Sequence, residues 1–305
     1  MRFAVFADLH YDVMPDGDRR VHDLLHSFEK NKVDFAIDLG DSISADPKNE
    51  TIMKRFKDYP CFFSIGNHNL DFCANETALR FTGLEKGYYS VVRENVKFIF
   101  LDANYVKTPD GYLHEDNASD VTGLCRPYIP PVQIEWLRNE LENDDLFYII
   151  CTHQGLTNEL TIETHSRGII NRDEIRVVLE KRNSDGRKIL FCMNGHDHGD
   201  AIHQINGIHY YSLTAASFVW QPKEIYAYDK ETHDRFPYLK NFIVYADALH
   251  IIVDIDAHMN VHIQGMESHY QRVTPEDVGM TRVWNNVSIE PRTSSLYIPS
   301  PLAYI

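Results

Sequence analysis

The sequence has few features of a membrane or secreted protein. It contains no apolar run long enough to cross a bilayer, and its hydrophobic start, Met1 to Ala7, is too short for the core of a signal peptide. Its five cysteines are odd in number and scattered. This usage predicts buried thiols in a reducing compartment and no disulfide frame. We therefore expect a cytoplasmic protein with no membrane partner.

Positive charge is also scarce. The chain has 30 Lys and Arg against 45 Asp and Glu, a formal net charge of −15, and no run of basic residues. This balance argues against a nucleic-acid backbone or an anionic membrane surface as the main partner, and it disfavours a nuclease. A local positive site, such as bound metal, would still attract a small anion.

What is present is an ordinary globular composition, with 305 residues, 43% hydrophobic and 25% charged. Short apolar runs alternate with helical patterns, which indicates an α/β protein with parallel strands. We expect one domain over 1–272 and a polar, proline-containing C-terminal extension, 273–305, packed on it. Residues 218–246 are rich in aromatic side chains without a clear period, and we expect irregular packing there. The predicted strands are 3–7, 33–39, 61–65, 88–92, 96–101, 146–151, 189–193, 207–213, 250–254 and 260–263, and the predicted helices are 19–30, 51–57, one from Pro130-Pro131 onward, and 171–181 with Asn171 as its cap.

Polar clusters follow the predicted strands. Asp8-Leu9-His10, Gly40-Asp41 and Gly66-Asn67-His68 come directly after the first three parallel strands. Two donors in alternation at a strand end, as at Asp8 and His10, are expected to point the same way. Each cluster alone is an ordinary turn, but three in succession meet at one edge of the sheet, where α/β proteins bind ligands.

Two later strands end in the same manner. The run 146–151 leads to His153, and the run 189–193 leads to Asn194-Gly195-His196-Asp197-His198-Gly199. Two imidazoles separated by one residue can reach one metal ion or two adjacent ions. An imidazole, carboxylate and amide set favours Mn, Fe or Zn over Mg.

This ordered set resembles the calcineurin-like metallophosphoesterase superfamily over about two thirds of the chain. The resemblance implies two mixed β-sheets packed face to face and flanked by helices. It implies that one divalent metal is held by Asp8, His10, Asp41 and His198, and a second by Asp41, Asn67, His153 and His196, with Asp41 bridging. It also places His68 beside the leaving-group oxygen, as a general acid or a charge stabiliser.

The charges of such a centre suit a phosphate substrate. Two divalent ions supply four positive charges, Asp8 and Asp41 cancel two, and a bridging hydroxide leaves roughly one for the anion. Two metals also activate water and bind the attacking and leaving oxygens of an in-line displacement.

The sequence departs from the family pattern in three places. Asn69 stands where relatives usually have an acid, which puts an acidic role there in doubt. The run Ser42-Ile43-Ser44-Ala45 after Asp41 lacks the acid and arginine of protein phosphatases. Gln154 follows His153, where cyclic-nucleotide phosphodiesterases often have a second histidine. The segment 195–199 with Gly207-Ile208-His209 resembles the ADP-ribose and CDP-alcohol diphosphatase branch of the superfamily.

We therefore expect a metallophosphoesterase that cleaves a small phosphodiester or pyrophosphate, with nucleotide-derived compounds among the candidate substrates. The alternatives are a phosphomonoesterase of the same superfamily and a catalytically silent metal-binding scaffold for protein partners. His165 and Arg167 follow the His153 strand and are candidates for phosphate binding. The other candidate pocket residues are Asn69, Tyr105 and Trp220, and each of these five is also compatible with a surface or packing role.

Overall fold

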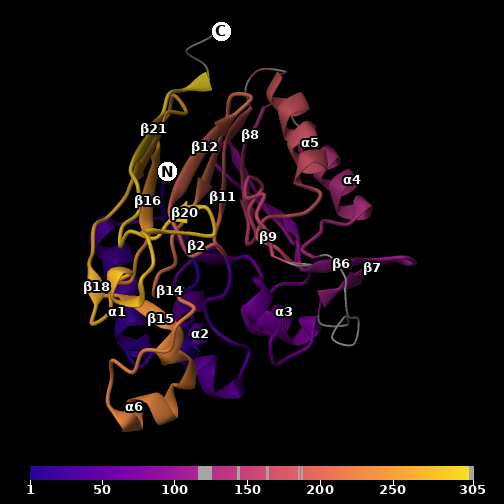
Figure 1. The fold of residues 1–305 in the computed structure, drawn as a ribbon. Helices are drawn as coiled ribbons and strands as arrows, with labels where there is room; N and C mark the ends of the chain where they lie inside the picture. The colour runs from indigo at the N-terminus through magenta and orange to yellow at the C-terminus, as the bar shows by residue number, and fades with distance from the viewer. Residues whose placement is uncertain (116–125, 143–144, 163–164, 185, 187, 302–305) are drawn as a thin grey trace.

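The computed structural model describes residues 1–115, 126–142, 145–162, 165–184, 186 and 188–301, with the side chains of residues 162 and 165 excepted. Two six-stranded mixed sheets lie face to face (Figure 1). In spatial order the first sheet consists of β21 (Leu296–Ile298), β17 (Val261–Gln264), β16 (Ile251–Ile255), β1 (Arg2–Phe6), β2 (Phe35–Asp38) and β3 (Cys61–Phe63). The second consists of β12 (Ala201–Ile205), β13 (Ile208–Ser212), β11 (Ile189–Asn194), β8 (Phe147–Thr152), β5 (Val96–Leu101) and β4 (Tyr89–Arg93).

Smaller elements surround the two sheets. A three-stranded sheet is formed by β14 (Phe218–Trp220), β15 (Phe242–Tyr245) and β18 (Tyr270–Gln271). The two-stranded pairs are β6 (Tyr105–Thr108) with β7 (Gly111–His114), β9 (Thr161–Ile162) with β10 (His165–Ser166), and β19 (Val283–Trp284) with β20 (Val287–Ser288). The α-helices are α1 (Gly17–Asn31), α2 (Glu50–Asp58), α3 (Asn75–Thr82), α4 (Pro131–Glu140), α5 (Arg172–Ser184) and α6 (Lys230–Arg235). Short 3-10 turns cover Tyr11–Val13, Pro47–Asn49, Asn67–Leu70, Pro237–Asn241 and Glu276–Val278.

The parallel strands of each sheet bring distant segments to one edge. In the first sheet, β1 pairs in parallel with β2, and β2 with β3. In the second sheet, β5, β8, β11 and β13 are successively parallel. Five loops therefore leave the sheets at the carboxyl ends of strands, namely those after β1, β2, β3, β8 and β11. The sequence predicts the ligand site at these strand ends.

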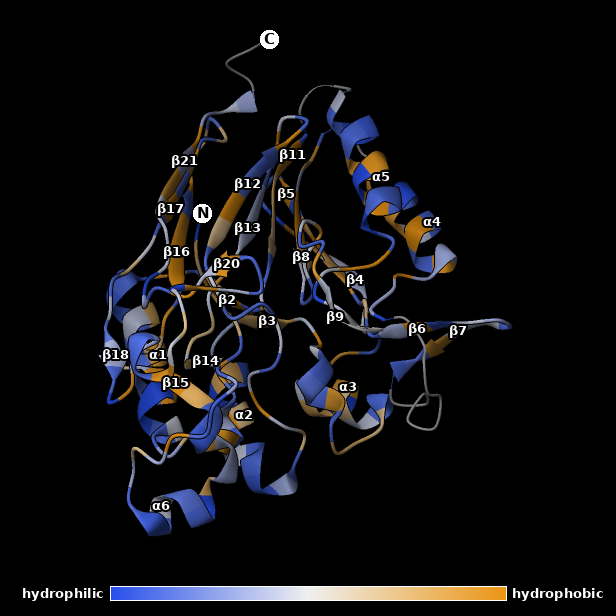
Figure 2. Ribbon diagram, viewed as in Figure 1, coloured by the Kyte–Doolittle hydropathy of each residue, from blue (hydrophilic) through white to orange (hydrophobic). Residues whose placement is uncertain are grey.

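Aromatic and aliphatic side chains fill the space between the sheets. Phe3 stacks on Phe35 of the neighbouring strand, and Phe98 of the second sheet meets both rings edge-on. Outside this core, α1 covers the first sheet through Leu24 and Phe28, while α4 and α5 cover the second. Figure 2 shows the result, with hydrophobic strands inside and hydrophilic outer faces on the helices. The expected sandwich of two mixed sheets with flanking helices is confirmed.

Two expectations from the sequence were wrong. Residues 218–246 are not irregular, because they contain β14, α6 and β15, and the two strands pair in antiparallel register. These strands are three and four residues long, too short for a visible period. Asn171 does precede α5, but its side chain does not cap the helix. Its amide oxygen accepts from the Ile129 N–H and its amide nitrogen donates to the Ile129 carbonyl.

The C-terminal segment contributes to the first sheet. β21 forms one edge of that sheet by pairing with β17. Ser288 of β20 exchanges main-chain hydrogen bonds with Asp200, next to the predicted ligand loop. None of the helices in the described part of the chain has the length and apolar character needed to cross a bilayer.

The described cysteines, Cys61, Cys73, Cys151 and Cys192, are all free thiols, and the last two are buried. The prediction of buried thiols is met fully at Cys151 and Cys192 and in part at the half-buried Cys61 and Cys73. Cys125 lies outside the described residues.

Candidate dinuclear metal centre

The ligand candidates reach the centre through strained loop backbone. β1 ends at Phe6, so Asp8 and His10 lie beyond the strand, and the predicted strand alternation does not place them. Both have left-handed backbone angles, with φ of 52° and 47°. Asp41, His196 and His198 share this conformation. It is costly for a residue with a Cβ and is typically retained at functional sites.

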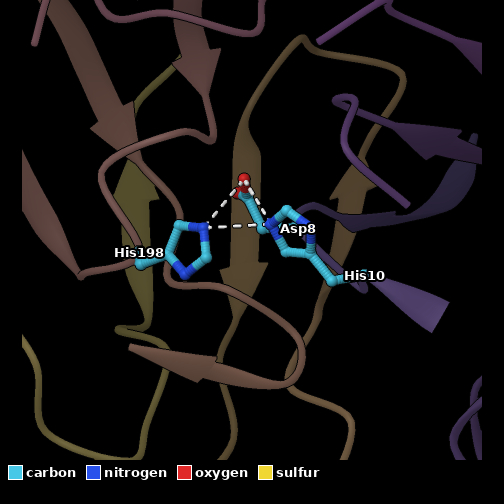
Figure 3. A group of neighbouring side chains, drawn as sticks. All are labelled: Asp8, His10 and His198. Atoms are coloured by element: carbon cyan, nitrogen blue, oxygen red, sulfur yellow. Dashed lines mark hydrogen bonds and ion pairs between the residues drawn. The ribbon is translucent and has the colours of Figure 1, made fainter. Parts of the chain in front are cut away.

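The first donor group consists of Asp8, His10 and His198 (Figure 3). The Nε2 atoms of the two histidines lie 3.2 Å apart. Oδ1 of Asp8 lies 3.4 Å from Nε2 of His198 and 4.0 Å from Nε2 of His10. Asp8 is fully buried and His198 is 3% exposed. Three donor atoms therefore converge on one point that water barely reaches.

The second donor group consists of Asp41, His153 and His196, all buried. Nε2 of His153 lies 2.8 Å from Oδ2 of Asp41 and 3.3 Å from Nδ1 of His196. It also lies 4.0 Å from Oδ1 of Asp8, which belongs to the first group. The two groups are therefore adjacent, as a dinuclear centre requires.

Asn67 adds a neutral oxygen to this set. Its Oδ1 is buried and accepts no hydrogen bond from any residue that the structure describes. A buried polar atom left in this way costs free energy, so it usually has a partner that the protein itself does not supply. A metal ion is such a partner for an amide oxygen.

Main-chain hydrogen bonds aim the two carboxylates. The His196 N–H donates to Oδ2 of Asp8, and the His68 N–H donates to Oδ1 of Asp41. The second oxygen of each carboxylate is left facing the histidines. Glycine is needed at both contacts, because a Cβ on Gly195 would lie 2.6 Å from Oδ2 of Asp8 and one on Gly66 would overlap Oδ1 of Asp41.

Carbonyl groups fix the orientation of two imidazoles. Nδ1 of His153 lies 2.8 Å from the Leu39 carbonyl, and Nδ1 of His198 lies 2.7 Å from the Phe218 carbonyl. Each Nδ1 must donate there, so Nε2 is the atom left for a ligand. This arrangement is typical of metal-binding histidines.

The electrostatics of the metal-free cluster are those of a cation site. Burial lowers the pKa of His10 to about 3, so its imidazole is neutral. Burial opposes ionisation of Asp41, but His153 and His68 hold the pKa of its carboxyl well below the ordinary range. Burial likewise opposes protonation of His153, yet Asp41 raises the pKa of that imidazole to about 9. The buried carboxylates therefore favour a protonated histidine beside them when no metal is bound, and the donor set fits two metal ions.

His68 has an acidic partner that the sequence reading missed. Nδ1 of His68 lies 2.7 Å from Oδ2 of Asp71, which directly follows the 3-10 turn. Asn69 instead holds the turn together, since its Oδ1 accepts from the N–H groups of Asp41 and Gly66. Although burial opposes protonation of His68, Asp41 and Asp71 raise its pKa to about 9. The doubt about an acidic role concerned position 69, which Asn69 occupies, and the acid that contacts His68 stands two positions later.

A cavity of about 270 Å³ opens over the donors. It is lined by Asp41, Asn67, His68, Asp71, Glu115, Arg126, Arg167, His196, His198 and Trp220. Arg167 donates from Nη2 to the His196 carbonyl at 2.7 Å, and its Nε lies 3.5 Å from Oδ1 of Asp197. The structure thus brings Arg167 and Trp220 to the centre.

The remaining sequence candidates lie differently. Tyr105 packs its ring against His114 in the β6–β7 pair and is not among the residues lining the cavity. The backbone of His165 lies in β10, but its side chain falls outside the described part of the chain. Glu115 and Arg126 line the cavity without having been singled out from the sequence, because nothing in their local pattern separates them from other polar loop residues.

Two sheets that deliver carboxylates, an amide and imidazoles to one cavity define a metal-dependent hydrolase with a dinuclear centre. The chain belongs to the calcineurin-like phosphoesterase family, whose model matches residues 1–200. It is therefore a hydrolase acting on phosphoester bonds. Comparison with curated protein sequences finds no match.

Solved structures support the fold. A dimetal phosphatase from Danio rerio is 13% identical, with a TM-score of 0.63 over 98% of this chain and 99% of the other. GAP50, described as the anchor in the inner membrane complex of Plasmodium, is 12% identical, with a TM-score of 0.52 over 90% of this chain and 87% of the other. PhoD is 12% identical, with a TM-score of 0.51 over 89% of this chain and 68% of the other.

Proposed function

We propose that this metallophosphoesterase cleaves a small phosphodiester or pyrophosphate. The observation that carries the proposal is the pair of donor groups, Asp8-His10-His198 and Asp41-His153-His196, whose ligand atoms lie within 4.8 Å of one another in each group. The groups share a cavity with His68 and Arg167. In this proposal the three residues of each group hold one metal, Asn67 joins the second group, and Asp41 bridges.

The metals, when bound, lower the pKa of a water molecule and neutralise charge on the phosphate oxygens. The chain supplies the rest. Asp71 binds Nδ1 of His68, which leaves Nε2 to donate a proton to the leaving-group oxygen. The ring of His68 lies 5.2 Å from that of His10, so the donor stands beside the first metal group. Arg167, held by Asp197 and the His196 carbonyl, contributes positive charge toward a phosphate oxygen.

A proton donor beside the centre favours an ester or pyrophosphate whose leaving group needs protonation. One solved structure of this fold, GAP50, is described as an anchor, which makes a scaffold the alternative. The complete donor set supports catalysis, since a scaffold has no use for six converging donors, of which five are buried and five have strained backbone.

The test compares bis(p-nitrophenyl) phosphate with p-nitrophenyl phosphate. The protein is stripped of metal and reconstituted with Mn²⁺, and metal content and p-nitrophenolate release are measured on the same sample. We expect two ions per chain and faster turnover of the diester. Turnover of the monoester alone would make the protein a phosphomonoesterase. Two bound ions without turnover of either ester, or of a nucleoside diphosphate compound, would favour the scaffold.

A further inference from the structure

A groove leads away from the metal cavity past His68. A hollow of about 190 Å³ is lined by His10, Asp41 and His68 and also by Phe72 and Tyr238. A further hollow of about 450 Å³ continues from His68 and Phe72 to Arg235 and Lys48. Because His68 lines all three hollows, a molecule with its phosphate at the metals can extend along this groove.

The groove has aromatic walls. Trp220 stacks at 30° to the His68 ring with centroids 6.4 Å apart, and its ring centroid lies 6.5 Å from that of Tyr238. Phe72 directly follows Asp71, the partner of His68, and its side chain is 86% exposed. Tyr238 is 52% exposed. Exposed aromatic side chains that gather beside a reaction centre are typical of a binding surface.

Two acidic side chains of the groove already have partners within the protein. Asp12 accepts hydrogen bonds from Ser44 and from the Asn49 amide. Asp46 accepts from the Lys48 N–H and pairs with its ammonium at 3.0 Å. What the inner groove offers a ligand is therefore the faces and edges of Trp220, Phe72 and Tyr238, and a flat, apolar group fits such walls.

We infer that this groove, defined by Trp220, Phe72 and Tyr238, binds a planar aromatic ring carried by the leaving group of the substrate. The inference rests on the proposed function, since it takes the phosphate at the metals and His68 at the leaving-group oxygen. It narrows the substrate class to esters or pyrophosphates whose departing part ends in a nucleobase or another planar ring. Because aromatic side chains stack on different planar rings, the groove should select a ligand for its flat ring more than for the hydrogen-bonding groups on that ring.

The inference is tested by binding, independently of turnover. The probes are phosphonate analogues of AMP and of ribose 5-phosphate, in which a CH₂ group replaces the ester oxygen and prevents hydrolysis. Isothermal titration of the Mn²⁺-loaded protein gives both Kd values. We expect the AMP analogue to bind about tenfold more tightly than the ribose analogue, as stacking of one base contributes. Benzylphosphonate serves as a third probe. If benzylphosphonate binds about tenfold more tightly than methylphosphonate, the groove accepts planar rings in general. If only the AMP analogue binds more tightly than its ring-free counterpart, the groove is specific for nucleobases.

Variants locate the preference in the groove. The double variant F72A/Y238A removes two exposed rings, and we expect the tenfold preference to fall to about twofold or less while metal content stays unchanged. Y226A is the matched control. Tyr226 is 64% exposed and packs near α6 against His233, but it does not line the two groove hollows. We expect this control to keep the full preference.

The failure of the inference differs from failure of the proposed function. The inference about the groove is contradicted if the wild-type protein binds the two analogues with equal Kd values, or if the preference survives in F72A/Y238A. Neither result contradicts the proposed hydrolysis. If the wild-type protein prefers the ring-bearing analogue and F72A/Y238A loses this preference, the groove is supported even when no ester is turned over. In that case only the proposed activity is contradicted.

Discussion

The metal cavity and the aromatic groove adjoin at His68 but are built in opposite ways. Five of the six donors of the cavity are buried, five have strained backbone, and main-chain hydrogen bonds fix the two carboxylates. The groove presents Phe72 and Tyr238 to solvent. Chemistry requires donors placed to within a fraction of an ångström, whereas stacking tolerates movement of the rings. Damage to the cavity should therefore abolish activity, and damage to the groove should only change which substrate is preferred.

The largest effect is expected from Asp41→Asn. The substitution removes one negative charge from a buried carboxylate of the second donor group. We expect kcat/KM for bis(p-nitrophenyl) phosphate to fall by at least about 100-fold, and bound metal to fall below two ions per chain. Hydrolysis and metal content are measured together.

Asp254→Asn is the matched control for this variant. Asp254 pairs with Arg2, at the end of β1 opposite to the centre. It should keep both activity and metal. If Asp41→Asn keeps wild-type activity, Asp41 is not part of the metal centre. The cavity would then tolerate substitution as well as the groove does.

His68→Ala should separate proton donation from metal binding. General acid catalysis contributes roughly 10²–10⁴ in rate when the leaving group needs a proton. We expect a loss of about 100-fold with diphenyl phosphate, whose phenolate is a poor leaving group. The loss should be only a few-fold with bis(p-nitrophenyl) phosphate, and metal content should not change.

Asp71→Asn sharpens the same prediction. It keeps the His68 ring but weakens the partner at Nδ1, so we expect an intermediate loss with the same dependence on leaving group. Equal losses for both esters in both variants would show that His68 and Asp71 only order the turn.

Metal removal should destabilise the protein measurably. An ion present at 100 times its Kd stabilises the folded state by about 2.7 kcal/mol, and 1 kcal/mol corresponds to about 2–4 °C in Tm for a large domain. We expect chelation to lower the Tm of the wild-type protein by about 5–10 °C for each ion removed, as measured by calorimetry. Asp41→Asn should respond less, because it binds less metal. An unchanged wild-type Tm would mean that no ion is bound to the folded state.

The smallest effect is expected from Phe72→Ala. The side chain is 86% exposed, so its removal leaves no cavity in the core. We expect a two- to threefold weaker Kd for the phosphonate analogue of AMP, with Tm and metal content unchanged. A Tm loss of several degrees would show instead that Phe72 is a packing residue and that the contrast between cavity and groove is overstated.

The sequence predicts the cavity better than the groove, for a physical reason. Apolar runs followed at once by Asp41, His153 or His196 mark strand ends, and parallel pairing brings those ends together. For Asp8 and His10, the sequence predicted that strand alternation would bring the two side chains together, and this was the wrong cause. Left-handed backbone angles position them, and such angles leave no trace in a local hydrophobic pattern.

The remaining elements depend on contacts between distant segments. β14 pairs with β15 across more than 20 intervening residues, so Trp220 could be placed beside His68 only by the fold. Asp71 was missed because Asn69 occupies the position where an acid is usual, while the 3-10 turn brings the residue two positions later to His68. Phe72 and Tyr238 carry no pattern at all, since an exposed ring in a loop is indistinguishable in sequence from any other loop residue.

The most direct test of the dinuclear centre is a stoichiometric titration of the metal-free protein with Mn²⁺, in which diester hydrolysis is followed against equivalents added. The two adjacent donor groups predict little activity up to the first equivalent and a rise to full activity at the second. Full activity at one equivalent, or none after two are bound, would contradict the account.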